Sequence, residues 1–462
     1  MAAAATIFFF GLGLTLVLGM AVFRSKRDAT ALLSLFAVLL LLIPARLVFP
    51  GVGGTGTPAN VVALLCAGWW AVALVFPSLG LTRGPQPIRW AVLGYVAAVL
   101  LSYAVAFRRP LSELEMSGMD RRLIELAALV GVALITADGV DTRQRLETLL
   151  RRVVVLASVV AGIGVVQFLF EADITPSLSP PGLVENLEIQ TGSQRSIFSR
   201  PYSTSLHPIE FSVVLAAMLP LALHFAFTSK TTLLAARNWT IVLLLAGATA
   251  MGVSRSGILG IVVGLTVLSL RWTWRRRLNA VALSLCFVAL MKAAVPGLIG
   301  TLQNLFSDVG EDPSIQGRLK DVAEVKSLLS ERPLTGRGAG SFNTEEFITL
   351  DNEYYKTFVE VGLTGIFALV LLLVVASVVT HKAAGRHIDP SDRHLGQAIL
   401  ASLLTCAVTM ATFDGLGYPM FSGVLFMLIG AAGAFWRLSM AQDAAQPSSP
   451  APMPVRELQH SL

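Results

Sequence analysis

The chain has 462 residues, of which 54% are hydrophobic and only 14% are charged, and its formal net charge is +6. A soluble globular domain carries about 25% charged residues, so this chain lacks the polar side chains to cover a water-facing surface of its size. Composition therefore excludes an ordinary soluble enzyme, and the basic residues are interpreted as topology signals before nucleic acid is considered as a partner.

Apolar runs of membrane-spanning length recur along the chain, which predicts an all-α, polytopic transmembrane helical bundle. In chain order the runs cover residues 5–23, 31–49, 60–80, 89–106, 122–137, 152–170, 208–227, 237–253, 256–270, 278–296, 357–380, 395–413 and 417–436. The fifth run is short and contains Glu125, so we expect 12–13 spans. No basic segment precedes the first run, which favours a first span over a cleaved signal peptide. We detect neither an internal repeat nor a broken span.

The loops between alternate runs are rich in arginine and lysine. These loops are residues 24–28, 82–89, 141–152, 230–237, 271–277 and 381–394, followed by the C-terminal tail. Because basic loops stay on the cytoplasmic side, the sequence predicts an outer N-terminus. The outer loops are then short, except for 171–207 and 297–356.

One transmembrane domain is predicted over residues 1–436, including both long extracytoplasmic loops. The second of these loops lies between the tenth and eleventh spans, and apolar residues recur there at helical spacing within 317–342. The stretch ERPLTGRGAG then predicts turns. Residues 437–462 are rich in Pro, Ser and Ala and predict a disordered cytoplasmic tail. The three cysteines form no metal-binding spacing.

An arginine stands in the middle of the apolar stretch LLLAGATAMGVSRSGILG. This residue, Arg255, lies at a tight outer turn between two spans and has no basic neighbours. A solvated turn residue is the simpler interpretation, since arginine near an interface can extend to water. Its position opposes the orientation rule, however, and this suggests a functional use.

Further polar residues gather on the same side of the membrane. The stretch FSRPYSTSLHPIEF (198–211) brings Arg200, Tyr202, His207 and Glu210 to the mouth of a span. Glu210 also suits the positive end of that helix, and His207 is equally compatible with an ordinary loop residue.

The start of the eleventh span carries another polar cluster. The stretch TLDNEYYKTFVEVG (349–362) contains Asp351, Asn352 and Tyr354, although Asp351 is also a good helix cap. Arg318 opens the predicted outer-loop helix, where a solvated charge is the simpler interpretation. Arginines at one cleft can bind phosphate oxygens, and a nearby carboxylate can take a proton from a hydroxyl nucleophile.

In these motifs the chain resembles the O-antigen ligase and O-antigen polymerase superfamily of bacterial integral-membrane glycosyltransferases, from about Pro44 to Gly433. The motifs are RPYSTSLHPIEF, the Ser254-Arg255 turn, Gly317-Arg318 with the P-x-x-G-x-G of residues 333–338, and DNEYYKTFVEVG. Each motif is loose, and their order and spacing together carry the resemblance.

The resemblance implies a type C fold that transfers a glycan from an undecaprenyl-diphosphate-linked donor to a hydroxyl of a glycan or lipid acceptor. It implies an inverting reaction without metal or cofactor, at the outer face of the bacterial cytoplasmic membrane, in polysaccharide or lipopolysaccharide biosynthesis. Arg255 and Arg318 would bind the donor diphosphate, with Arg200 in support. The expected partners are the lipid-linked donor, the acceptor and membrane lipids, without nucleic acid.

Asp351 and His207 both remain candidates for the catalytic base. O-antigen ligases usually carry a histidine where this chain has Asp351, so ligase-like and polymerase-like acceptors both remain open. The residues expected to bind substrate are Asn352, Tyr354, Tyr202 and Glu210. An alternative function is a transporter or flippase of lipid-linked oligosaccharides, and a non-catalytic scaffold is a third.

Overall fold

The computed structural model describes residues 29–82, 84–186, 194–195, 198–307, 325–326, 328, 332–343, 347, 350–387 and 389–445. The predicted first span and Arg318 lie outside these residues, as does most of the helix expected within 317–342.

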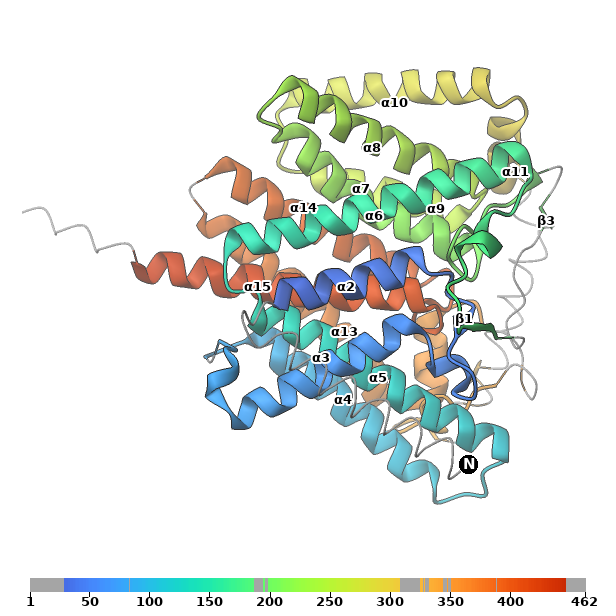
Figure 1. The fold of residues 1–462 in the computed structure, drawn as a ribbon, viewed down its shortest axis with the longest axis vertical. Coiled ribbons are helices and arrows are strands. Elements are labelled where there is room, and N and C mark those ends of the chain that lie inside the picture. The colour runs from blue at the N-terminus through green and yellow to red at the C-terminus, as the bar shows by residue number, and fades with distance from the viewer. Residues whose placement is uncertain are drawn as a thin grey trace, which may run out of the picture.

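The described chain is a bundle of long helices with very little strand (Figure 1). The helices are α2 (Ala29–Leu42), α3 (Pro58–Val75), α4 (Pro87–Ala106), α5 (Glu113–Gly139), α6 (Arg143–Phe170), α7 (Pro208–Phe227), α8 (Thr232–Met251), α9 (Arg255–Ser269), α10 (Trp274–Ala294), α11 (Leu298–Ser307), α13 (Glu353–Arg386), α14 (Pro390–Thr409) and α15 (Pro419–Ala445). Eight helices of the described chain are long and apolar enough to cross a membrane, and α2 and α9 are shorter apolar helices. The predicted polytopic helical bundle is confirmed.

Polar caps fix where the helices begin. Ser112 and Glu115 form a reciprocal capping box at the start of α5, and the side chains of Thr57, Thr142 and Thr231 accept amide hydrogen bonds at the starts of α3, α6 and α8. Each cap satisfies an amide group that the first helical turn leaves without a partner. The doubtful fifth run is therefore part of a full helix of 27 residues, because its polar first half is capped and continuous with the apolar second half.

Helix α7 is the centre of the bundle. Of the apolar window in α7, 94% is buried, against 28–44% for α3, α4, α6, α8 and α13. It packs against α6, α8, α9, α14 and α15. A helix that is apolar on all sides is buried on all sides, and α7 has this pattern.

The two ends of the bundle carry different loops. At one end the basic loops contact one another: Arg143 Nη2 lies 2.7 Å from Asp392, and Arg89 Nη2 lies 3.0 Å from Asp138. At the other end the long loop after α6 returns to the chain after α2, where Ala45 N donates to Thr204 O at 2.8 Å. We call these the inner and the outer end, following the predicted orientation.

Two pairs of short strands lie at the outer end; β1 falls in the run predicted at 31–49, and the other three strands fall in the loop predicted at 171–207. Strand β1 (Leu47–Val48) pairs antiparallel with β2 (Val184–Glu185), and β3 (Gln194–Arg195) pairs antiparallel with β4 (Phe198–Ser199). The run predicted at 31–49 is thus divided, because α2 ends before Pro44 and the chain then turns into β1.

Helix α15 continues to Ala445, into the segment predicted as a disordered tail from residue 437. The reason is tertiary contact at the inner end: Arg437 Nε donates to Ala137 O at 3.2 Å, so α15 is fastened to α5 beyond its apolar run. The rest of the predicted tail lies outside the described residues.

Helix α13 is broken at Gly362, where φ is 73° and ψ is −164°, which corrects our expectation of unbroken spans. The break leaves the carbonyl groups of Val359 and Glu360 without helical partners, and buried backbone groups need partners. The outer-loop segment 333–340 supplies them, since two of its amide groups donate to these carbonyls at 3.0 and 2.8 Å. Two amide groups after the break donate back to the same segment at 2.9 and 3.2 Å.

The segment 333–340 has the turn-rich backbone that its sequence predicted. Gly336, Gly338 and Gly340 all have positive φ. A Cβ atom on Gly336 would lie 2.4 Å from the backbone of Glu360, so only glycine fits this close approach to α13.

Candidate active site

The loop between α14 and α15, residues 410–418, joins the outer ends of several helices. The contacts along it are Asn352 Nδ2 to Ala411 O at 3.0 Å, Thr412 Oγ1 to Ser256 Oγ at 2.7 Å, Lys356 Nζ to Asp414 Oδ2 at 2.6 Å, and Arg122 Nη1 to Leu416 O at 2.9 Å. Helices α5, α9 and α13 therefore meet at this loop, whose importance was not predicted from the sequence.

Arg200 and Arg255 lie at the same turn. Arg200 is 6% exposed, and its Nε donates to the carbonyl of Gly252 at 3.0 Å, in the turn between α8 and α9. Arg255 is the first residue of α9, directly after the N-cap Ser254. The turn brings two of the three predicted arginines to the N-terminus of α9, which carries the positive end of the helix dipole.

The backbone of this turn is tight. Val253 has φ of 43°, an uncommon value for a β-branched residue, and a Cβ on Gly252 would lie 2.0 Å from Ser212 Oγ. The turn is therefore pressed against the first part of α7, and its shape is set by packing against that central helix.

His207 caps α7, and its neighbours set its protonation state. Its Nδ1 accepts a hydrogen bond from the amide of Ile209 at 3.1 Å. Burial, helped by the nearby Arg200 charge, lowers the pKa of His207 to about 4. The ring is therefore neutral at pH 7, with Nδ1 occupied as an acceptor and the proton on Nε2.

Asp351 and His207 both lie near Tyr418. The rings of His207 and Tyr418 are 6.0 Å apart between centroids. Burial, together with the charges of Asp414, Glu210 and Asp351, raises the pKa of the Tyr418 phenol above its usual range. Tyr418 thus stays protonated, and it stands close to both base candidates.

The four predicted substrate-binding residues also form hydrogen bonds that join segments of the bundle. Asn352 is the N-cap of α13, where its Oδ1 accepts from the amides of Tyr354 and Tyr355 at 2.9 and 3.3 Å. The other contacts are Tyr354 Oη to Ala407 O at 2.6 Å, Tyr202 Oη to Asp173 Oδ2 at 2.7 Å, and Glu210 with the amides of Leu206, Met420 and Phe421 at 2.8, 2.8 and 3.1 Å. Their role in binding substrate stays a prediction.

A group of charges lies between α13 and the 410–418 loop, where Asp414, which was not identified from the sequence, joins Glu353 and Lys356 of the polar cluster 349–362. Lys356 and Asp414 form an ion pair whose side chains are 23% and 24% exposed, and Glu353 Oε2 accepts from the amide of Leu416 at 2.8 Å. Burial would raise the pKa of Asp414, but Lys356 and neighbouring donors outweigh it and hold that pKa below its usual range. The available signal was Asp414 itself, a carboxylate in the short outer loop TFDGLGYP between two apolar runs.

The described residues contain no group of three or more His, Cys, Asp or Glu side chains arranged to hold a metal ion. The charged atoms described around the site are arginine, lysine and carboxylate groups, which can bind anionic oxygens and transfer protons.

Comparison with known proteins bears on the region that holds this site. The family model described as O-antigen ligase matches residues 240–370, which include Arg255, the segment 333–340 and Asp351. None of the curated proteins matches the chain. Over residues 240–370 the predicted resemblance to the O-antigen ligase and O-antigen polymerase superfamily is therefore confirmed.

Proposed function

We propose that this protein transfers a glycan from a polyprenyl-diphosphate-linked donor to a hydroxyl of a glycan or lipid acceptor, at the outer face of the bacterial cytoplasmic membrane. The O-antigen ligase match supports glycosyltransferase activity of this general kind, and the long apolar helices support an integral membrane protein.

The observation that carries the proposal is the convergence at the outer end. The turn holding Arg255 receives the Arg200 side chain, and it is tied through Ser256 to the 410–418 loop. Asp351 lies beside that loop, one residue before the cap of α13. Two cationic groups and a carboxylate thus come from three separate segments of the chain, and the 410–418 loop links two of these segments.

The proposed diphosphate site is the N-terminus of α9. Arg255 is the first residue of this helix, so its charge and the first amide groups lie at the same terminus, and both favour phosphate oxygens. Arg200 approaches from the loop before α7, and Arg318, outside the described residues, would complete the set. Arginines of this kind stabilise the charge that develops on the diphosphate as it leaves.

We propose Asp351 as the base in preference to His207. His207 is a poor base because its Nδ1 is engaged by the Ile209 amide and its Nε2 carries the proton. A second proton on the ring is also unfavourable because burial, helped by the Arg200 charge, lowers the pKa of His207 to about 4. His207 instead has a hydrogen to donate to a substrate oxygen.

The step is a single displacement. The Asp351 carboxylate takes the proton from the acceptor hydroxyl while that oxygen forms a bond to the anomeric carbon of the donor glycan. The bond from the anomeric carbon to the diphosphate oxygen breaks, and polyprenyl diphosphate leaves with the electron pair. Attack opposite the leaving group inverts the anomeric configuration.

The test is glycan transfer by purified protein in lipid nanodiscs, supplied with polyprenyl-diphosphate-linked donor and acceptor. We expect Arg255→Ala to reduce kcat by about 100-fold or more, as for loss of a donor that stabilises transition-state charge. We expect Asp351→Asn to reduce kcat by about 100-fold to 10000-fold. His207→Asn, which keeps a capping side chain, should stay within about 10-fold of the wild type.

Arg145→Ala is the matched control, because Arg145 is a half-buried arginine at the inner end that pairs with Asp141, and this variant should transfer glycan at the wild-type rate. Full activity of Asp351→Asn would remove Asp351 from the base role, and full activity of Arg255→Ala would remove the diphosphate site.

Transport of lipid-linked oligosaccharide is a second candidate, favoured by the break in α13, since broken helices are common in transporters. Movement of the donor between leaflets without formation of a glycosidic bond would favour transport over transfer.

A further inference from the structure

The middle of the chain is free of acidic residues. No Asp or Glu occurs between Glu210 and Asp308, a stretch that contains α7, α8, α9 and α10. The same stretch contains a concentrated basic loop, RWTWRRR, in which Arg271, Arg275, Arg276 and Arg277 surround the turn from α9 to α10. We call these four residues the arginine quartet. Any neutralising carboxylate would have to come from another part of the bundle.

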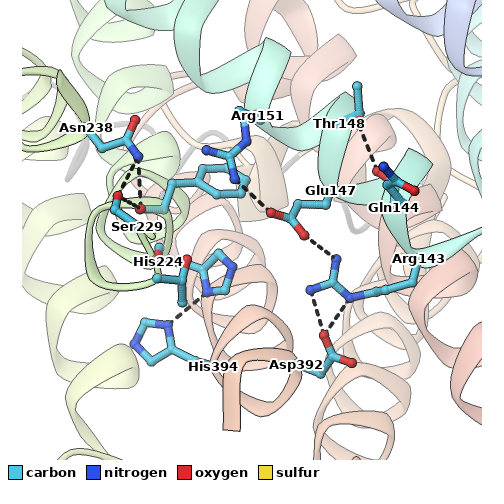
Figure 2. A network of polar contacts seen from close by, with 12 residues as sticks. Arg143, Gln144, Glu147, Thr148, Arg151, His224, Ser229, Asn238, Asp392 and His394 are labelled. Carbon is cyan, nitrogen blue, oxygen red and sulfur yellow. Dashed lines mark hydrogen bonds and ion pairs between the residues drawn. The ribbon is translucent and has the colours of Figure 1, made fainter. Parts of the chain in front are cut away.

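Elsewhere at the inner end, several arginines of α6 are paired with carboxylates. Figure 2 shows Arg143 between Glu147 and Asp392, at 3.2 and 2.7 Å, and Arg151 with Glu147 at 2.8 Å. Arg145 pairs with Asp141 at 3.3 Å. Three of the four α6 arginines therefore have carboxylate partners, and Arg152 donates to Ser34 Oγ instead. No ion pair with a carboxylate is found for the quartet among the described residues.

Arg276 shows how the quartet is held without a counter-charge. Its guanidinium carbon lies 3.6 Å from the centroid of the Phe227 ring and 4.8 Å from that of Trp272. Its Nε is buried without a hydrogen-bond partner, and its Nη2 lies 3.3 Å from His394 Nε2. Aromatic faces and an imidazole nitrogen orient this arginine, but they bring no negative charge.

The histidine beside Arg276 is itself neutral. Trp272 Nε1 can only donate, and it lies 3.4 Å from His394 Nε2, so this nitrogen is an acceptor and the proton is on Nδ1. His394 Nδ1 then donates to His224 Nδ1 at 3.0 Å, as Figure 2 draws the pair. Both rings are thereby fixed as neutral tautomers, and neither competes with a phosphate for Arg276.

The rest of the quartet faces the membrane boundary. Arg271 and Arg275 are exposed, and Arg277 donates to the last carbonyls of α9, Ser269 O and Leu270 O, at 3.0 Å each. Trp274, at the start of α10, is 70% exposed. Tryptophan and arginine at the end of an apolar helix are typical of the headgroup level of a bilayer.

An apolar surface continues from this level toward the bilayer centre. Helix α10 is apolar enough to span, yet none of its apolar window is buried, and it runs along the edge of the bundle (Figure 1). Leu278 and Val281, on its first turns, are 50% and 57% exposed. Acyl chains therefore have direct access to the helix that begins at the arginine quartet.

We propose that the arginine quartet binds the phosphate headgroup of an anionic phospholipid, whose acyl chains lie against α10. Because the four arginines have no carboxylate partners among the described residues, they favour an anionic headgroup. Because α10 exposes apolar side chains next to them, the site favours a lipid over a soluble phosphate. The site lies at the end of the bundle opposite the candidate active site, and the proposal does not depend on the reaction.

The test is native mass spectrometry of the full-length protein, delipidated in detergent and titrated with phosphatidylglycerol, with phosphatidylcholine or with inorganic phosphate. We expect phosphatidylglycerol to bind preferentially. The double variant Arg271→Gln/Arg275→Gln removes two exposed charges and leaves the stacked Arg276 in place, and it should weaken that binding by about 10-fold or more. The double variant Arg145→Gln/Arg152→Gln removes the same charge from α6 and should bind as the wild type does.

Equal binding of phosphatidylcholine would overturn the charge-based selection, and equal weakening by both double variants would overturn the location. If inorganic phosphate occupies the site as tightly as phosphatidylglycerol, the site is for a soluble anion and the lipid assignment is wrong. Because the readout is bound lipid, failure here leaves the proposed transfer reaction untouched, and failure of transfer leaves this result untouched.

Discussion

At the outer end, side chains at the start of one helix also accept hydrogen bonds from segments that are distant in sequence. Glu210 illustrates this: its place in the first turn of α7 was evident from the sequence, and a carboxylate there suits the helix dipole. The structure adds that two of the three amide groups it accepts belong to Met420 and Phe421, at the start of α15. The sequence shows that Glu210 begins α7, but it does not show that the same carboxylate also caps a second helix.

His207 gives a pH-dependent prediction at the same scale. In an unfolded chain its pKa is about 6.5, and in the folded protein the pKa is about 4, so the unfolded state binds the proton more readily between these values. Folding stability should therefore fall as pH drops from about 6.5 to 4, by about 2–3 kcal/mol from this residue. In His207→Asn, thermal unfolding followed in detergent should show a shallower fall over this range.

The control is His381→Asn, since His381 is exposed in the inner half of α13. Carboxylates add acid sensitivity to all three proteins, so the difference between variants is the informative quantity. Parallel pH profiles for wild type and His207→Asn would show that His207 is not held neutral by its surroundings.

Helix α13 was predicted from its sequence, but its break was not. Its apolar run and polar start were predicted, and the structure confirms a helix there. Its break was missed because Gly362 looks like an ordinary small residue in an apolar run. The backbone groups that compensate for the break belong to residues 333–340. Their hydrogen bonds to α13 depend on tertiary packing, which the local sequence of α13 does not show.

We predict that Gly362→Ala destabilises the protein by about 3 kcal/mol or more. At φ of 73° a side chain is strained, and the new Cβ would lie 2.4 Å from the carbonyl carbon of Leu334. Gly162→Ala is the matched control, because a methyl group at this position of α6 would meet no neighbouring atom within 4 Å. Alanine there should be neutral or stabilising by up to about 1 kcal/mol.

Thermal unfolding of the two purified glycine variants measures the difference. A normal midpoint for Gly362→Ala would mean that α13 can run straight through this position and that the contact with 333–340 is dispensable.

For the molecule as a whole, hydropathy located the helices well, although eight helices of the described residues, not 12–13, are long and apolar enough to cross a membrane. Every predicted run from 31–49 onward coincides with a helix of the described residues, and the boundaries moved where a proline or a polar cap decided them. The candidate site was predicted less completely. Arg200, Arg255, His207 and Asp351 were identified, but the 410–418 loop that joins their segments was not, because a short loop becomes central only once the helices are packed.

The orientation of the bundle is open to a direct test. We predict that Ser177→Cys, in the exposed loop after α6, reacts with a membrane-impermeant maleimide in intact spheroplasts. Thr232→Cys, exposed at the start of α8, should react only after the membrane is permeabilised. Both changes are made in a chain whose exposed Cys286 is replaced by Ser, which removes the background label. The reverse labelling pattern would place the proposed active site in the cytoplasm.

The break in α13 also bears on how the outer end would respond to substrate. Residues 353–361 are hydrogen-bonded to segment 333–340 and separated from the rest of α13 by Gly362. Because Leu363 and Thr364 also donate to this segment, a displacement of segment 333–340 would act on α13 on both sides of the break. Segment 333–340 is thus coupled to the start of α13, and we expect its position to affect the distance between Asp351 and Arg255.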